Sequence, residues 1–271
     1  APYEQHEWSL TDLRKLTHAI TEKYQKAGFI TSLAYIPPQD VQGGVLTIRV
    51  LEGKVGDLIV EGNRYFRKRK ILSYSKLKKG AVLRVDKVRA TVKYMNQNPD
   101  RVVSVNLRPG EAPETTDIVI KVEDHFPVHW GFSHDNLGSP ASGEHRFGLN
   151  LADNNFTSLD DSASVGTIFG KEFGFIFTQY SIPFTPTNTK LIAGFSHGQV
   201  NPKKQLEDSH VDSISQNYSI GIEQSVSQLD FLNFVLQASM DFLESRTLVL
   251  ARTYVRERLR VLRFSPRMVI P

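Results

Sequence analysis

The hydrophobic and polar positions in the first half of the chain follow one pattern that occurs twice. Residues 13–52 align with residues 85–124 without a gap, at an offset of 72 residues. Self-similarity at a fixed period is the signature of repeated structural units. The pattern therefore predicts three parts: residues 1–53, residues 54–125 as a second copy, and a different C-terminal part, 126–271. The matching positions include Lys15/Lys87, Gln25/Gln97, Ser32/Ser104, Pro37/Pro109, Val50/Val122, Ile20/Val92, Leu33/Val105 and Glu52/Asp124.

The first copy begins with a helical pattern. Apolar residues recur at steps of three and four from Leu13 to Tyr24, which predicts an amphipathic helix over residues 10–27. Ser9, with Asp12 three residues later, predicts an N-cap, and Gly28 predicts the end of the helix. Strands are predicted over 30–36 and 45–51, joined by a loop that contains Pro37-Pro38 and Gly43-Gly44.

The second copy repeats these elements and shows what precedes them. It predicts a strand at 55–60, a short basic helix around 67–76, a helix at 85–97 and strands at 102–108 and 116–123. The order within one unit is βααββ. The matching first strand of the first copy would lie before residue 1, so we expect the chain to begin inside a domain.

This tandem unit resembles the polypeptide-transport-associated (POTRA) domain of outer-membrane transporters. The segment 55–63, with the sequence VGDLIVEGN, is similar to the opening strand of such a domain. The segments GFIT at 28–31 and LEGKV at 51–55 are similar to the haemolysin-activator version. The resemblance covers residues 9–125.

After Pro127 the period changes from helical to two. In 214–227, Tyr218, Ile220 and Ile222 share one parity, while serine, asparagine, glycine and glutamate occupy the other. Residues 231–243 alternate in the same way. Successive strand residues point to opposite faces, so each strand has one apolar and one polar face. A transmembrane barrel around a wet lumen and a soluble sandwich both produce this alternation.

Local motifs favour the barrel. The run DNLGS at 135–139, with Asn154-Asn155 and Asp160-Asp161, resembles the first hairpin of two-partner secretion transporters, and YSIPF at 180–184 resembles their next one. We count seven or eight strands, fewer than the family barrel has. We also find neither the Arg-Gly-containing inward loop nor the plug helix of that family. The resemblance implies a fold of α+β tandem POTRA (βααββ) domains followed by antiparallel transmembrane β-barrel strands of an incomplete barrel. An incomplete barrel leaves an edge that lipid cannot satisfy, so we do not expect this chain to transport a client by itself.

Composition removes several classes of function. The chain has no cysteine, which excludes disulfides, thiolate metal sites and a cysteine nucleophile. The common cofactor and hydrolase motifs are absent, so we predict neither an enzyme nor a cofactor. His125, His129 and His134 are close in sequence but lack a helical i, i+4 frame, which argues against a metal site. Asp160-Asp161 is more typical of a hairpin turn than of an acid–base pair.

The segment 64–79 carries eight lysines and arginines and no acid. Interleaved Tyr65, Phe66 and Tyr74 suggest single-strand nucleic-acid binding. A helix that buries Phe66, Ile71, Leu72 and Leu77 explains the same pattern better. We therefore predict solvated cations, with anionic lipid headgroups as their functional partner and no nucleic acid.

The POTRA resemblance implies a three-stranded sheet whose edge is the strand after the second helix. Residues 30–36 and 102–108 would then offer free backbone groups to an extended client. Core packing also explains the apolar residues of the adjoining helix, so the polar tips of Tyr24 and Tyr35 are better candidates for contact. The predicted client-binding residues are Leu16, Ile20, Tyr24, Ile30, Ser32, Leu33, Tyr35, Val103 and Val105.

The resemblance implies an outer-membrane translocator with periplasmic POTRA domains. It would capture an unfolded, β-rich exoprotein, such as a haemolysin-like or adhesin-like β-helical client, and export it through a barrel pore. We expect a monomer that contacts outer-membrane lipid. Two alternatives stay open: a barrel assembly or insertion factor, and a soluble periplasmic scaffold whose C-terminal part is a sandwich. The sequence does not indicate which repeat binds the client.

Overall fold

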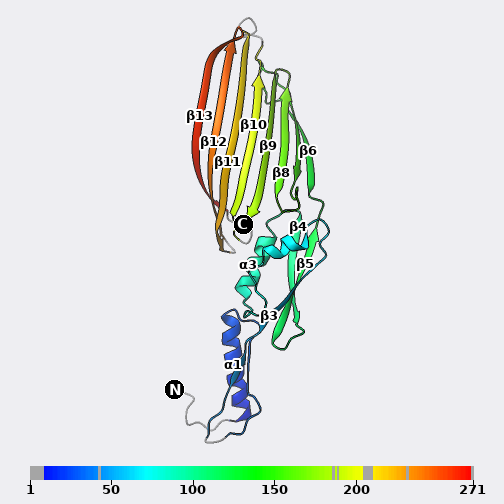
Figure 1. Cartoon of the computed structure of the whole chain (residues 1–271), viewed down its shortest axis with the longest axis vertical. Helices are drawn as coiled ribbons and strands as arrows, with labels where there is room; N and C mark the ends of the chain where they lie inside the picture. Colours follow the sequence, from blue (N-terminus) through cyan, green and yellow to red (C-terminus); the bar gives the residue numbers. More distant parts are fainter. Residues whose placement is uncertain are drawn as a thin grey trace. The chain divides into compact units, whose positions relative to one another are not determined.

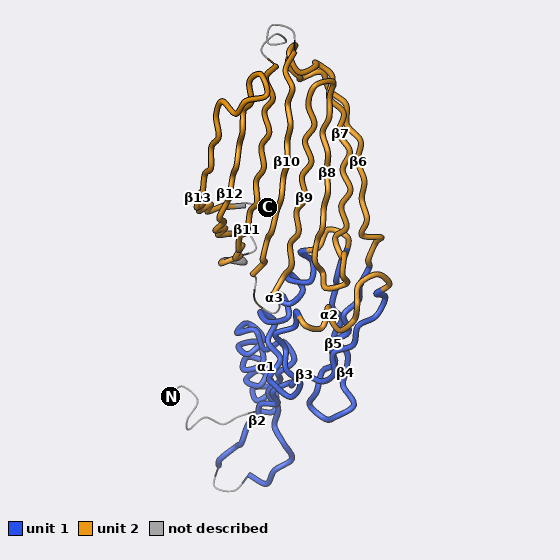
Figure 2. The backbone as a smooth tube through the Cα atoms, turned by 45° about the horizontal axis from the view of Figure 1, so that its top comes forward, with its two compact units in different colours: residues 1–63, 74–97, 101–123 blue, residues 64–73, 98–100, 124–271 orange. Residues whose placement is uncertain are grey.

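The computed structural model describes residues 9–41, 44–184, 187, 189–203, 210–229 and 232–269. Gly43, one of the predicted loop glycines, lies outside the described residues. The chain forms two compact units (Figure 2). The first contains residues 1–63, 74–97 and 101–123, and the second contains 64–73, 98–100 and 124–271. No helix of the described residues is long and apolar enough to cross a membrane.

The first repeat consists of one long helix and two short strands. Helix α1 (Leu10–Lys26) begins at Ser9, whose hydroxyl oxygen accepts a hydrogen bond from the N–H of Asp12, which confirms the predicted cap. The helix ends before Gly28, whose φ of +93° belongs to the left-handed region that glycine adopts readily. Strands β1 (Leu33–Tyr35) and β2 (Arg49–Leu51) pair in antiparallel register.

These two strands are shorter than the predicted 30–36 and 45–51. A turn in which the N–H of Ser32 donates to the carbonyl of Phe29 replaces the start of the first strand, and a side chain shortens the ends next to the loop. The amide of Gln39 donates to the carbonyl of Thr47 at 2.7 Å and accepts from its N–H at 2.9 Å. The side chain thus occupies the backbone groups that a longer strand would have paired. The prediction of seven-residue strands here is wrong.

The second repeat contains a complete three-stranded sheet. It comprises β3 (Lys54–Glu61), α2 (Lys68–Ser73), α3 (Val85–Met95), β4 (Arg101–Pro109) and β5 (Thr115–Asp124). The strand order is β3-β5-β4, with β3 and β5 parallel (Figure 1). Its core is apolar and includes Val55, Leu83, Met95, Val103, Ile118, Ile120 and Val122. Phe66, Ile71 and Leu77 of the basic segment are also buried, as predicted, whereas Leu72 is only half-buried.

The second unit is dominated by an antiparallel sheet of eight strands. These are β6 (Val128–Asp135), β7 (Arg146–Asp153), β8 (Ser162–Gly170), β9 (Phe173–Phe184), β10 (Thr189–Val200), β11 (Val211–Leu229), β12 (Leu232–Val249) and β13 (Arg252–Val269). Each strand pairs with its neighbour in sequence, and the sheet is not closed: β6 and β13 are its two edges (Figure 1). The predicted count of seven or eight strands is confirmed.

The register confirms that this sheet has one apolar and one polar face. Directly paired residues share a face, so a single row can be followed across all eight strands. That row is mostly apolar and reads Trp130, Leu151, Val165, Thr178, Phe195, Tyr218, Phe242 and Arg260. The next row, on the opposite face, contains Gln179, Gly194, Ser219 and Asp241. We call these the apolar face and the polar face.

Candidate functional site

The free edge of the second-repeat sheet is β4, and part of it is already occupied. The Asn96 side chain accepts a hydrogen bond from the N–H of Val103 at 2.6 Å and donates to the carbonyl of Val103 at 3.0 Å. Asn96 follows the last residue of α3, so the end of that helix places its amide against the strand. Asn96 thus imitates a partner strand at one position.

The contact with Asn96 also shows which residues of β4 present their backbone to the edge. N–H and C=O groups of alternate strand residues point to the same side, so Val105, Leu107 and Pro109 share the direction of Val103. Proline has no N–H, and such residues are confined to edge strands. The open part of the edge therefore comprises Val105 and Leu107, bounded by Asn96 at one end and Pro109 at the other. We call these two residues the open edge.

The side chains around the open edge are only partly covered. Leu107 is 38% exposed and Val105 is half-buried. Val88 and Val92 on α3, the helix that contacts β4, are half-buried as well. These two valines occupy the positions that Leu16 and Ile20 hold in the first repeat. The second repeat thus combines free backbone groups with nearby apolar side chains, the features that an added strand requires.

In the first repeat the corresponding edge is covered from within the chain. The N–H of Ala34 donates to the hydroxyl of Thr21 on α1 at 2.9 Å. The N–H of Ser32 donates to the carbonyl of Phe29 at 3.1 Å. The prediction that residues 30–36 form a free edge is therefore wrong at these two positions, because side-chain and turn hydrogen bonds satisfy their N–H groups.

The structure divides the nine predicted client-binding residues into three classes by burial. Ser32 and Val103 are buried, so their side chains belong to the packing beneath the strands. Ile30, Leu33 and Tyr35 are exposed, while the remaining four are half-buried: Leu16, Ile20, Tyr24 and Val105. The predicted list of client-binding residues omitted Asn96, Leu107 and Pro109, although Leu107 lies within the predicted edge 102–108. Pro109 did stand out in the repeat, whereas nothing in the sequence indicated which backbone groups the Asn96 amide binds.

The polar face of the eight-stranded sheet contains a second candidate site, a cavity of about 440 Å³. Two ion pairs cross it: Arg263 with Asp241 at 3.0 Å, and Arg267 with Glu223 at 2.8 Å. The rest of its lining is mainly small or amide-bearing and includes Gln179, Gly194, Ser219, Gly221, Gln237, Ser239 and Ser265. Each arginine has its own carboxylate, so this surface is hydrophilic but locally neutral.

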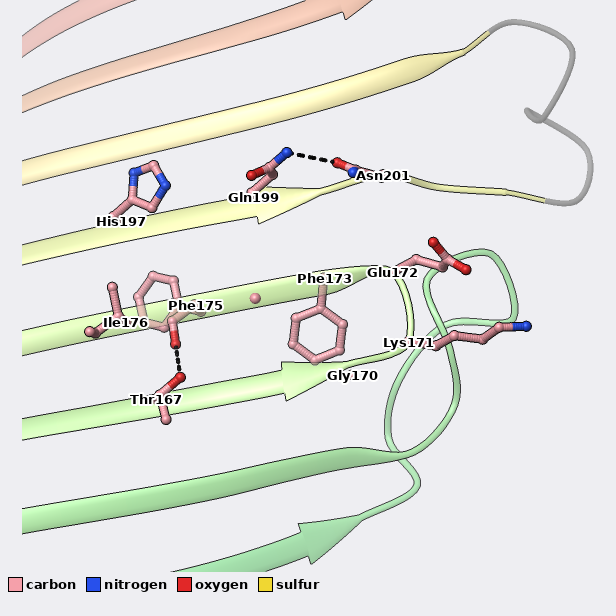
Figure 3. A pocket seen from close by; sticks show the side chains of 11 residues that line it. Thr167, Gly170, Lys171, Glu172, Phe173, Phe175, Ile176, His197, Gln199 and Asn201 are labelled. Atoms are coloured by element: carbon pink, nitrogen blue, oxygen red, sulfur yellow. Dashed lines mark hydrogen bonds between the residues drawn. The ribbon is translucent and has the colours of Figure 1, made fainter.

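A further pocket of about 460 Å³ lies where β8, β9 and β10 end (Figure 3). Several of its polar side chains already have partners. The His197 imidazole is 3.3 Å from the Gln216 amide, and Glu172 forms an ion pair with Lys203 at 3.2 Å. Phe173 and Phe175 supply most of its aromatic lining (Figure 3). This combination of paired polar and aromatic side chains is typical of a surface at the ends of strands, and it does not form an arrangement of nucleophile and base.

Two of the three histidines considered for a metal, His129 and His134, have separate surroundings. The imidazole of His129 is 2.8 Å from the Asp100 carboxylate. The ring of His134 stacks on His145 and Phe147. Within the described ranges, no three metal-ligating side chains come together.

Asp160-Asp161 lies in the turn between β7 and β8, as predicted. Asp161 is fully buried and accepts hydrogen bonds from the N–H and hydroxyl of Thr157 and from the Tyr180 hydroxyl, at 3.0, 2.9 and 2.9 Å. Burial opposes the charge of Asp161, but these hydrogen bonds outweigh it and hold the pKa of the carboxyl below its ordinary value. The carboxylate therefore organises the turn.

The depressed pKa gives this turn a defined pH dependence. Its stabilisation is complete above the unfolded-state pKa of 3.8 and is lost as the pH falls through the lower folded-state value. We expect Asp161→Asn to reduce the free energy of unfolding by about 1–3 kcal/mol at pH 7. We also expect the stability of this variant to fall less steeply as the pH is lowered, which flattens the acid limb of its stability–pH curve. Thermal unfolding followed by circular dichroism from pH 7 to pH 2 measures both effects. An acid limb as steep as that of the unmodified chain would contradict this role of Asp161.

Comparison with known proteins yields three matches to family models. Residues 114–249 match the haemolysin secretion/activation protein family ShlB/FhaC/HecB. Residues 1–53 match the ShlB-type POTRA domain, and residues 54–124 match the POTRA model described as a surface antigen variable number repeat.

Curated relatives agree with these matches. The chain is 27% identical over 153 residues to the outer membrane transporter CdiB of Dickeya dadantii, covering 56% of this chain and 27% of that protein. It is 25% identical over 161 residues to the heme/hemopexin transporter protein HuxB of Haemophilus influenzae, covering 59% and 28%. The matched segments thus span less than a third of these relatives.

Solved structures share the fold. CdiB from Escherichia coli superimposes with a TM-score of 0.76 at 20% identity, covering 98% of this chain and 51% of that one. BamA from Haemophilus ducreyi gives a TM-score of 0.59 at 12% identity, covering 98% and 54%.

Proposed function

Because the chain belongs to the haemolysin secretion/activation protein family, whose members are outer-membrane transporters with periplasmic POTRA domains, we propose that it captures an unfolded, β-rich exoprotein by strand addition to the open edge of β4. The names of CdiB and HuxB, both transporters, support a transport role. The observation that carries the proposal is the pair of unprotected positions, Val105 and Leu107, between Asn96 and Pro109.

The energetics of strand addition suit transient capture. One backbone hydrogen bond contributes about 0.5–1.5 kcal/mol net, and the open edge offers only two residues. Apolar contacts with Val88, Val92 and Leu107 would add to this. A short edge therefore holds a client weakly, and a client that must move on requires weak binding. Pro109 and Asn96 also limit the hazard of edge-to-edge association between copies of the chain.

The polar face provides the second part of the proposed mechanism. In a barrel, it would line the lumen through which the client passes as an extended chain. The paired charges, Arg263 with Asp241 and Arg267 with Glu223, leave no strong net field along that surface. A passing segment thus meets serine, glutamine and satisfied ion pairs, none of which would retain it. The mechanism requires neither a nucleotide nor a metal.

Removing one backbone donor tests the capture step. We expect Leu107→Pro in the full chain to weaken binding by about tenfold, since it removes the Leu107 N–H and about 1.4 kcal/mol is tenfold in affinity. Proline is tolerated at edge positions whose N–H faces outward. The measurement is fluorescence anisotropy of labelled, unfolded N-terminal segments of candidate β-helical exoproteins, with the protein in detergent micelles.

Val102→Ser is the matched control for this experiment. Val102 is 57% exposed, but its backbone points toward β5 and not to the open edge. We therefore expect this variant to bind the client like the unmodified chain. Asn96→Ala would uncover Val103 and should bind at least as tightly. Equal binding by the Leu107→Pro and Val102→Ser variants would contradict capture at the open edge.

A further inference from the structure

Four arginines and one glutamate gather on the apolar face, at the end of the sheet where β12 turns into β13. Register pairs Phe242 with Arg260, Glu244 with Arg258, and Arg246 with Arg256, so all these side chains share one face. The arginines are exposed to solvent. We call Arg246, Arg256, Arg258, Arg260 and Glu244 the arginine cluster.

The cluster begins where the apolar surface stops. On the same face, β12 presents Phe234, Leu236, Ala238, Met240 and Phe242, and β13 presents Leu262, Phe264, Pro266 and Met268. The nine residues from 234 to 242, at about 3.4 Å each, make this band about 31 Å long along the strand. At a strand tilt of about 40° the band is about 23 Å tall, which matches the band of about 25 Å that faces lipid in outer-membrane barrels. The arginine cluster therefore lies at the depth of the lipid headgroups.

The charges of the cluster are unbalanced. One Glu244 carboxylate oxygen accepts hydrogen bonds from both Arg246 and Arg256, and the other lies 3.4 Å from Arg258. Arg260 has no ion-pair partner in the described part of the chain. The facing positions on β11, Gln216 and Ile214, are uncharged. Three guanidinium groups thus share one carboxylate and the fourth has none, whereas each arginine in the cavity of the polar face has a carboxylate of its own.

Guanidinium groups of this kind bind phosphate. Their planar fork of N–H donors matches two oxygens of one phosphate, and such charge-assisted hydrogen bonds are about twice as strong as neutral ones. Glu244 holds three of the guanidinium groups together. Their side chains are thus partly ordered before an anion arrives, and less side-chain entropy is lost when it binds. We propose that the arginine cluster binds the phosphate group of an anionic lipid at the edge of the apolar band.

The position along the chain indicates which membrane surface is involved. β6 begins shortly after the second repeat, and β12 leads to the opposite end of the sheet from the start of β6. Since the POTRA domains of the family are periplasmic, the cluster belongs to the external surface. It is thus separate from the basic segment 64–79, which precedes β6.

Lipid retention tests the proposal. The full chain would be purified in dodecyl maltoside micelles doped with dimyristoyl phosphatidic acid, and the retained lipid would be measured by native mass spectrometry. We expect the double variant Arg256→Gln/Arg258→Gln to retain at least about tenfold less lipid than the unmodified chain. Arg256→Lys/Arg258→Lys should fall between the two, because lysine keeps the charge but loses the fork.

The control is Arg263→Gln/Arg267→Gln, which makes the same charge change on the polar face of the same strand. Its retention should equal that of the unmodified chain, with circular dichroism confirming the β content of every variant. Equal loss in both double glutamine variants would show a dependence on net charge alone and would overturn the proposal. Inorganic phosphate that displaces the lipid at low millimolar concentration would overturn its lipid part. Equal retention by the lysine and glutamine variants would overturn the role of the guanidinium fork.

Discussion

Replacing Ile220 by arginine is expected to weaken insertion of the chain into a lipid bilayer by about 2–4 kcal/mol. Ile220 lies on the apolar face near the middle of β11, paired with Ala193 and Met240, and is 52% exposed. In a bilayer this exposed side chain would face hydrocarbon. A charged group there costs the most near the midplane. The expected change corresponds to roughly 30- to 700-fold in the partition constant.

The neighbouring residue gives a stringent control for Ile220→Arg. Ser219 points to the polar face and pairs with Asp241, so Ser219→Arg places the same charge beside a carboxylate. We expect it to insert like the unmodified chain. Flotation with phosphatidylcholine vesicles, followed by quantification of bound protein, measures both variants. Equal losses for the two would mean that the faces are not lipid-facing and lumen-facing, and would favour a sandwich.

The second large effect is expected at Asp124, the last residue of β5. Its carboxylate accepts hydrogen bonds from three consecutive backbone N–H groups, those of Arg64, Tyr65 and Phe66, at 2.9–3.1 Å. Hydrogen bonds to a charged group contribute about 1.5–3 kcal/mol each, and the three are not additive. We expect Asp124→Ala to lower the free energy of unfolding by about 2–4 kcal/mol.

Hydrogen exchange distinguishes a local from a general effect of this substitution. The amides of residues 64–66 should lose protection first, because they lose their acceptor, and urea unfolding gives the total change. Glu123→Ala is the matched control, since Glu123 is the exposed neighbour of Asp124 on the same strand. Surface changes of that kind usually stay within about 0.5 kcal/mol. Unchanged protection of residues 64–66 in Asp124→Ala would contradict the anchoring role.

The regular elements of the fold follow from the sequence because they rest on local rules. The periodicity from Leu13 to Tyr24, together with Ser9 and Gly28, is enough to place α1. Alternation places the long strands, and the resulting faces agree with the register. The repeat itself, with Asp124 in the place of Glu52, separates the first half of the chain from the second.

The features that the sequence did not predict depend on single side chains that replace backbone partners. Gln39 shortens the first-repeat strands by binding Thr47, Thr21 covers Ala34, and Asn96 covers Val103. No propensity or period reveals which backbone group an amide or a hydroxyl will choose. The sequence did not predict the arginine cluster for a different reason. Arg256, Arg258 and Arg260 alternate visibly in the sequence, but only the pairing of β12 with β13 shows which face they share.

The difference between the two strand edges has a consequence for stoichiometry. A duplicated domain suggests two equivalent client-binding sites and the avidity that tandem sites produce. Here the Thr21 hydroxyl and the Phe29 carbonyl satisfy the N–H groups of Ala34 and Ser32 in the first repeat, while Val105 and Leu107 stay open in the second. Under the proposed capture mechanism, we therefore expect one client segment to bind per molecule, without transfer from repeat to repeat. A client would advance by dissociating from β4 and binding β4 again through a later segment of its own sequence.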